Sequence, residues 1–65
     1  MNKKQVIHLA AKYYLYANDA VILERNGDYS EAWEKWNKAR YYSRKYENIE
    51  WCTSRAERCK KLGAF

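Results

Sequence analysis

The segment Asn26–Ala39 decides the fold: Asn-Gly-Asp-Tyr-Ser-Glu-Ala-Trp-Glu-Lys-Trp-Asn-Lys-Ala. Gly27 is expected to end a preceding helix, because glycine adopts the left-handed conformation at little steric cost. Asp28, with Glu31 three residues later, is typical of the capping box that begins a new helix. The inner stripe of that helix alternates small and large residues: Ala32, Trp36, Ala39 and Ser43. The segment therefore predicts a tight turn between two antiparallel, closely packed helices.

On the N-terminal side, residues 3–25 contain no helix breaker, and apolar residues recur there at steps of three and four. One series is expected to face the other helices: Val6, Ala10, Tyr13, Ala17, Ala20 and Leu23. Further apolar residues lie beside it, in excess of what two neighbouring helices require: Ile7, Ala11, Tyr14, Leu15, Val21 and Ile22. Exposed apolar patches on small proteins usually mark partner surfaces, so we predict partner binding through this second series. The alternative is that the other helices cover it.

On the C-terminal side, the second helix is expected to span about residues 29–44 and a third about residues 49–62. Residues 46–48 are the predicted break, with Asn48 as the cap and Gly63 as the stop. The inner stripe of the third helix is expected to comprise Ile49, Cys52, Ala56 and Cys59. Short connections favour an up-down-up arrangement. We therefore expect one all-α domain over residues 1–65, a three-helix antiparallel bundle in which a third helix packs on a helical hairpin.

Composition agrees with a small helical domain. The 65 residues include no proline and two glycines, and 17% are aromatic. A chain of this length has a thin core, so large aromatic side chains or a partner must supply stability. The apolar stretch near the N-terminus is interrupted by His8, Lys12 and Asp19, which argues against an export signal or a membrane span. We therefore expect a cytoplasmic protein with no membrane partner.

The net charge of +5 is unevenly distributed. Through Glu34 the four basic and five acidic residues sum to −1, whereas from Lys35 the nine basic and three acidic residues sum to +6. Candidate contacts to an anionic partner are Lys3, Lys4, Arg40, Arg44, Arg58, Lys60 and Lys61. Positive charge near helix C-termini also stabilises the helix dipole. A DNA-binding helix-turn-helix is disfavoured because its recognition helix would begin with Asp28 and Glu31, so direct DNA binding is not the expected function.

The residues offer no constellation for chemistry. Cys52 and Cys59 lie seven apart on one helix, about 10 Å along its axis, which is too far for a disulfide. With His8 as the sole histidine, a zinc site would lack a fourth ligand. No nucleophile–base pair and no glycine-rich phosphate loop is present. We expect no enzymatic activity, no cofactor and no metal, and two buried reduced thiols.

Two family resemblances are carried by particular residues. Residues 27–39 are similar to the turn and second helix of a tetratricopeptide repeat. A wider set spans about residues 10–60: Ala20, Glu24, Gly27, Tyr29, Ala32, Trp36, Ala39, Asn48, Trp51, Cys52, Arg55 and Cys59. This set resembles the ANR family, small negative regulators in enteric and related pathogenic bacteria. Its most specific part is the run Trp-Cys-x-x-Arg-x-x-x-Cys over residues 51–59.

The ANR resemblance implies direct binding to AraC-family transcription activators of virulence and adhesion genes, which blocks their self-association or DNA binding. It also implies a homodimer and the nucleoid protein H-NS as further partners. The matching residues fall on the turn and the inner stripes, so they identify the scaffold and not the contact surface. Two alternatives stay open: a small basic DNA- or nucleoid-associated regulator, and an oligomeric helical adaptor.

Overall fold

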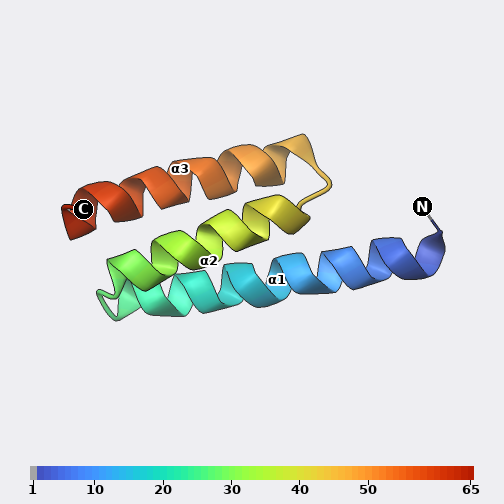
Figure 1. Ribbon diagram of the computed structural model, residues 1–65, viewed down its shortest axis with the longest axis horizontal. Coiled ribbons are helices and arrows are strands. Elements are labelled where there is room, and N and C mark those ends of the chain that lie inside the picture. Colours follow the sequence, from blue (N-terminus) through green and yellow to red (C-terminus); the bar gives the residue numbers. More distant parts are fainter. Residues whose placement is uncertain (1) are drawn as a thin grey trace.

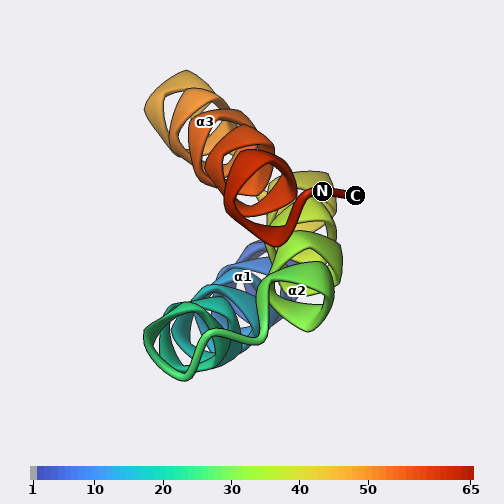
Figure 2. The same ribbon diagram turned by 90° about the vertical axis from the view of Figure 1, so that its left-hand side faces the viewer.

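The computed structural model describes residues 2–65, which form three helices and, over that range, no strand. They are α1 (Lys3–Arg25), α2 (Tyr29–Tyr42) and α3 (Tyr46–Gly63). Consecutive helices run antiparallel (Figure 1). Both α1 and α3 pack against α2, and in the end-on view they diverge from each other (Figure 2). The expectation of an all-helical chain with three packed helices is confirmed.

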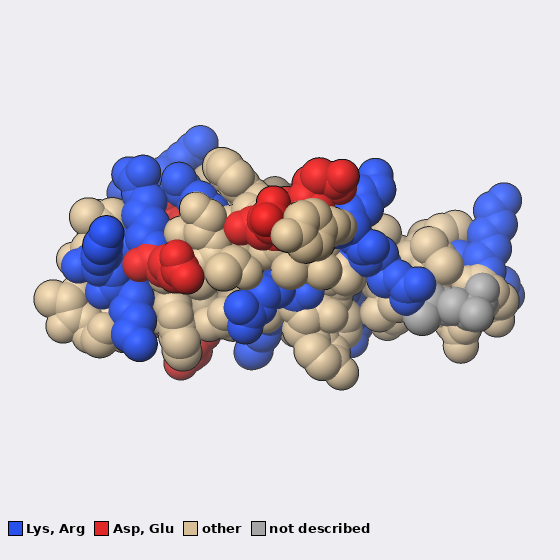
Figure 3. All heavy atoms as spheres, turned by 90° about the horizontal axis from the view of Figure 1, so that it is seen from above, with Lys and Arg blue, Asp and Glu red and all other residues tan. Residues whose placement is uncertain are grey.

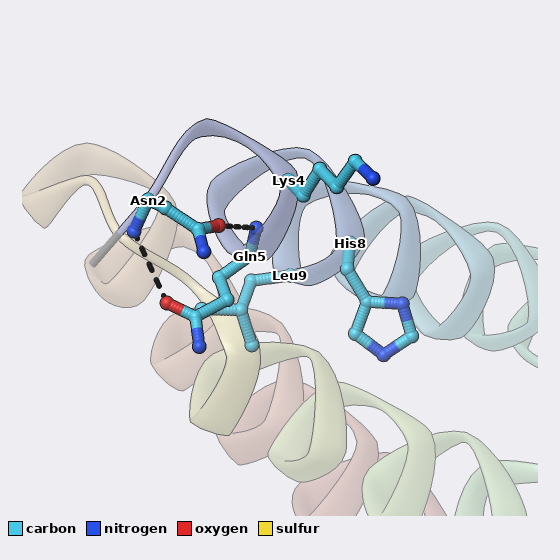
Figure 4. Close-up of a pocket in the computed structure, with 5 residues that line it drawn as sticks. All are labelled: Asn2, Lys4, Gln5, His8 and Leu9. Atoms are coloured by element: carbon cyan, nitrogen blue, oxygen red, sulfur yellow. Dashed lines mark hydrogen bonds between the residues drawn. The ribbon is translucent and has the colours of Figure 1, made fainter.

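The two ends of α1 are held by local hydrogen bonds. At its start the Gln5 amide donates to Asn2 Oδ1 at 2.9 Å and the Asn2 amide donates to Gln5 Oε1 at 3.1 Å, which forms a capping box that was not predicted (Figure 4). At its end Gly27 has a φ of 81°, the left-handed conformation expected of it. The Asp28 amide then donates to the Leu23 carbonyl at 2.8 Å, which closes the turn.

The second connection differs from the prediction. Helix α2 stops at Tyr42 instead of residue 44, and α3 begins at Tyr46 instead of residue 49. Asn48 therefore lies inside the first turn of α3 and does not cap it. The reason is local: the Ser43 hydroxyl donates to the Lys45 carbonyl at 3.2 Å, and such side-chain bonds compete with helix continuation.

Of two other predicted helix signals, the Asp28 cap is wrong, and the stop at Gly63 is confirmed but its left-handed residue is displaced by one position. Asp28 occupies the N-cap position of α2, but its side chain makes no capping bond. Gly63 is the last residue of α3, and the left-handed residue is Ala64, with a φ of 56°. A Cβ at residue 63 would lie 2.7 Å from the Phe65 ring. Gly63 therefore allows the chain to fold back, so that Phe65 meets Trp33 edge-on with ring centroids 5.8 Å apart.

The core is thin and consists mostly of small residues. Its buried members are Tyr13, Ala20, Ala32, Trp36, Ala39, Cys52, Ala56 and Cys59. The alanines let the backbones approach, while Trp36, 1% exposed, fills the space between them. The inner stripe of α2 is confirmed except at Ser43, which lies outside the helix. On α3 the predicted stripe is buried except at half-buried Ile49.

The predicted inner stripe of α1 is correct only in its second half. Tyr13 and Ala20 are buried, and Ala17 and Leu23 pack partly buried against the core. Val6 is 42% exposed and Ala10 is also exposed. The cause is length: α1 has 23 residues and α2 has 14, so the N-terminal turns of α1 extend beyond the other helices (Figure 1).

Candidate partner-binding surface

A row of large apolar side chains lies on the face of α1 that points away from the core. This outer face comprises Ile7, Ala11, Tyr14, Leu15 and Ile22. The four large members are each between 56% and 61% exposed, and Ala11 is exposed with them. Their spacing of three, four and seven residues places them on one side of the helix, opposite the buried side chains of Tyr13 and Ala20. The outer face is therefore uncovered by any other part of residues 2–65.

Val21, the sixth residue of the predicted surface, differs from the other five. It is half-buried and packs against the core cluster. It follows buried Ala20 directly and so lies at the edge of the core face. Val21 therefore contributes mainly to the packing of α1 on its neighbours.

A largely buried carboxylate connects all three helices. Glu24 on α1, 9% exposed in its side chain, accepts a hydrogen bond from Trp36 Nε1 on α2 at 2.7 Å. Its second oxygen forms an ion pair with the Arg55 guanidinium of α3. The Cys59 thiol donates to Glu24 at 3.4 Å, and Arg55 also lies over the Trp51 ring, 5.3 Å from its centroid. These five residues belong to the set that resembles the ANR family, and here they hold the fold together.

The buried hydroxyl and thiols near this core are poor nucleophiles. Burial raises the pKa of Tyr13 to about 12, with the neighbouring Cys52 adding to the effect. Burial, together with the adjacent Glu24 carboxylate, raises the pKa of Cys59 to about 11. Burial likewise raises the pKa of Cys52. Both cysteines are free and fully buried, so at neutral pH they remain protonated small hydrophobes.

The candidate anionic-partner residues divide into two groups. Lys3, Lys4, Arg40 and Arg44 lie toward the end of the molecule where α1 begins and α2 ends. The other three, Arg58, Lys60 and Lys61, lie at the opposite end, where α3 ends. On the face viewed in Figure 3, Lys and Arg side chains are spread along the molecule and interspersed with carboxylates. The structure therefore does not merge the seven residues into one basic stripe.

A cluster of tyrosines and lysines on α1 and α2 was missed by sequence reasoning. The rings of Tyr16 and Tyr42 stack with centroids 5.7 Å apart and an interplanar angle of 12°. Lys12 lies over Tyr42 at 5.0 Å, and Lys35 and Lys38 lie over Tyr16, each at 5.6 Å. Such contacts contribute about 0.5–1 kcal/mol each at exposed sites. Three of the surplus cations thus have a role in packing α1 on α2.

Two hollows adjoin the first turns of α1. One is an open depression beside the capping box, lined by Asn2, Lys4, Gln5, His8 and Leu9 (Figure 4). The other is a cleft of about 180 Å³ between α1 and the α2–α3 connection. The cleft is lined by Val6, Ala10, Tyr13, Tyr14, Tyr42, Arg44, Lys45 and Asn48. Neither hollow contains a carboxylate in its lining.

Neither metal-ligand clusters within residues 2–65 nor similarity to known proteins indicates a function for this surface. No group of three or more His, Cys, Asp or Glu residues within residues 2–65 is placed to hold a metal ion. None of the three helices is long and apolar enough to cross a bilayer. No family model, curated protein or solved structure matches the chain. The exposed surfaces are therefore the features of this molecule that bear on its function.

Proposed function

We propose that this protein is a bacterial cytoplasmic negative regulator of transcription that binds an AraC-family activator and blocks its dimerisation or DNA binding. The observation that carries the proposal is the outer face of α1. Four large apolar side chains, each more than half exposed, follow one another along a helix whose opposite face forms the core. A helix with this pattern packs into an apolar groove, or against another helix, of a partner protein.

The resemblance to the ANR family selects the class of partner. Of its matched residues, Glu24, Trp36, Arg55 and Cys59 form one connected, partly buried cluster, and Gly27 makes the turn before α2. Such a cluster supports the proposal that this chain and the ANR proteins have the same scaffold. The turn and the buried alanines of α2 also support the proposed likeness to a tetratricopeptide hairpin. The contact residues are then the exposed ones, which the motif does not include.

The free energy gained by burying the outer face limits the affinity that this face can provide alone. Full burial of a large apolar side chain contributes about 1.5–3 kcal/mol, so covering four half-exposed ones contributes roughly 3–6 kcal/mol. Micromolar affinity requires about 8 kcal/mol after the costs of association. The outer face therefore supplies a substantial part of binding and needs additional contacts beside it.

The test is binding of the purified protein to AraC-family activators by calorimetry, with Ile7→Glu and Ile22→Glu as variants. Each substitution places a charge at an exposed site, so the fold should survive, and affinity should fall by at least about tenfold. The control is Leu62→Glu, which alters an exposed apolar residue on α3. Thermal melts by circular dichroism verify folding. Parental affinity in both folded α1 variants would refute the assignment of this face.

The alternative of a DNA- or nucleoid-associated regulator, acting directly or through H-NS, is less well supported. Its candidate cations lie at two ends of the molecule, and three further lysines lie over tyrosine rings. Gel-shift titrations at two salt concentrations separate the ideas, because phosphate contacts make affinity steeply salt-dependent. Sedimentation of the protein alone tests the homodimer and the oligomeric adaptor.

A further inference from the structure

The core face of α1 continues past the end of α2. Val6, Tyr13 and Ala20 are spaced by seven residues and so share one side of the helix. Ala20 is 0% exposed, Tyr13 is 8% exposed and Val6 is 42% exposed. The N-terminal turns of α1 therefore present the face that, farther along, is covered by α2 and α3. We call this part of α1, residues 3–11, the overhang.

The overhang forms one wall of the cleft described above. Its apolar contribution is Val6 and Ala10, and Tyr13 and Tyr14 continue the wall where the overhang joins the core. The facing wall comes from Tyr42 at the end of α2 and from the polar residues Arg44, Lys45 and Asn48. The cleft is thus an apolar helix face bordered by a basic rim, assembled from segments about 35 residues apart in the chain.

The charged side chains that line the cleft are both basic, and Glu47 lies next to the lining, in the first turn of α3. The ionisable side chains in its lining are two cations and three tyrosines, with no carboxylate. Lys3 and Lys4 begin the overhang, and the first turn of α1 contains no acidic residue. Such a rim attracts and orients a negatively charged segment, and it disfavours a positively charged one.

We propose that the cleft binds an acidic amphipathic helix of the partner protein. An exposed helix face is complementary to the apolar face of another helix, which would lie along the overhang where α2 no longer covers it. Carboxylates flanking that helix would meet Lys45 at the rim of the cleft. This inference rests on the proposed function, because the occupant is a segment of a regulated protein, and it adds a second contact surface and the charge of its ligand.

A second copy of this chain fits the cleft less well. The protein carries a net charge of +5, and in a two-fold dimer both copies would present the same basic patch, with Lys3, Lys4 and Lys45, to the interface. Like charges brought together in an interface weaken association. The occupant is therefore expected to come from a different protein with an acidic helix.

The test uses two synthetic helical peptides and ¹⁵N-labelled protein. One peptide has leucines on one face and glutamate with alanine elsewhere, and the other replaces every glutamate by lysine. The glutamate peptide should shift the amide resonances of Val6, Ala10 and Lys45, with an affinity that falls as salt rises. Val6→Ser should weaken binding about fivefold and Lys45→Glu about tenfold. The matched controls, Leu62→Ser and Lys61→Glu, change exposed residues of α3 and should bind within about twofold of the parent.

Equal binding of both peptides, no shift with the glutamate peptide, or unchanged binding by Val6→Ser and Lys45→Glu would overturn the inference. Loss of self-association in Lys45→Glu, seen by sedimentation, would also overturn it in favour of a second copy. The two proposals fail separately. If Ile22→Glu abolishes activator binding and Lys45→Glu does not, the proposed function stands and the cleft is not a contact surface. A cleft that binds the glutamate peptide in a protein that binds no activator refutes the function alone.

Discussion

Replacement of Glu24 by alanine should destabilise the protein by about 3 kcal/mol. The substitution removes the acceptor of Trp36 Nε1 and the partner of Arg55. Breaking a buried ion pair from one side costs about 3–5 kcal/mol. Arg55 is 25% exposed and can turn partly into water, which places the cost at the lower end. Marginal stability of about 0.05–0.15 kcal/mol per residue gives this chain roughly 3–10 kcal/mol in total, so a large share would be lost.

The assay is urea unfolding followed by tryptophan fluorescence. The expected order of midpoints is parent, then Glu24→Gln, then Glu24→Ala, because glutamine keeps an acceptor for Trp36 but loses the charge that pairs with Arg55. A double-mutant cycle with Arg55→Ala should show that the two changes together cost less than their sum. The control is Glu57→Ala, an exposed carboxylate of α3, which should change stability by less than about 0.5 kcal/mol. A Glu24→Ala variant within about 1 kcal/mol of the parent would refute the structural role of the cluster.

Two further predictions concern the core and the first turn. Stability should be constant through neutral pH and fall above about pH 9, because the pKa values of Cys59 and Tyr13 are raised in the folded state to about 11 and about 12. A group whose pKa is higher in the folded state stabilises the fold at pH values below its unfolded pKa, and this stability is lost as the pH rises through its folded pKa. Urea midpoints measured from pH 7 to 11 should show the fall in stability, and a flat profile would contradict it. Gly27→Ala should cost about 1–2 kcal/mol, because the φ of 81° at this position is unfavourable for a residue with a Cβ; a thermal melt at or above the parental midpoint would contradict the turn geometry.

The helices themselves were largely predictable because their signals are local. Residues 3–25 lack a breaker, and Gly27 marks the turn where the structure has it. The second connection was not predictable from the same rules. Asn48 is a good cap by residue type, but the Ser43 hydroxyl bonds the backbone two residues on and sets the end of α2 earlier. The capping preference of Asn48 and the backbone bond of Ser43 favour different helix boundaries, and the sequence pattern alone does not show which of them prevails.

The candidate surfaces were predictable only in part. The outer face of α1 could be predicted from the excess of apolar residues in that helix. The cleft depends on how far α1 extends past α2, and a helical wheel contains no information on that length. The contact between Glu24 and Arg55 joins residues 31 apart in sequence. A signal did exist: Glu24 lies four residues after Ala20 on the core face, and a carboxylate in that position requires a buried partner.

The arrangement allows stability and binding to be changed separately along one helix. Residues 13–24 of α1 supply the core contacts and the carboxylate that joins three helices, so substitutions there that remove buried groups lower stability as well as function. The overhang has exposed Val6 and Ile7 and no buried residue, so substitutions there should leave the fold almost unchanged. A loss of partner binding caused by Ile7→Glu at parental stability would therefore be evidence about a binding surface, whereas the same loss caused by Glu24→Ala would not.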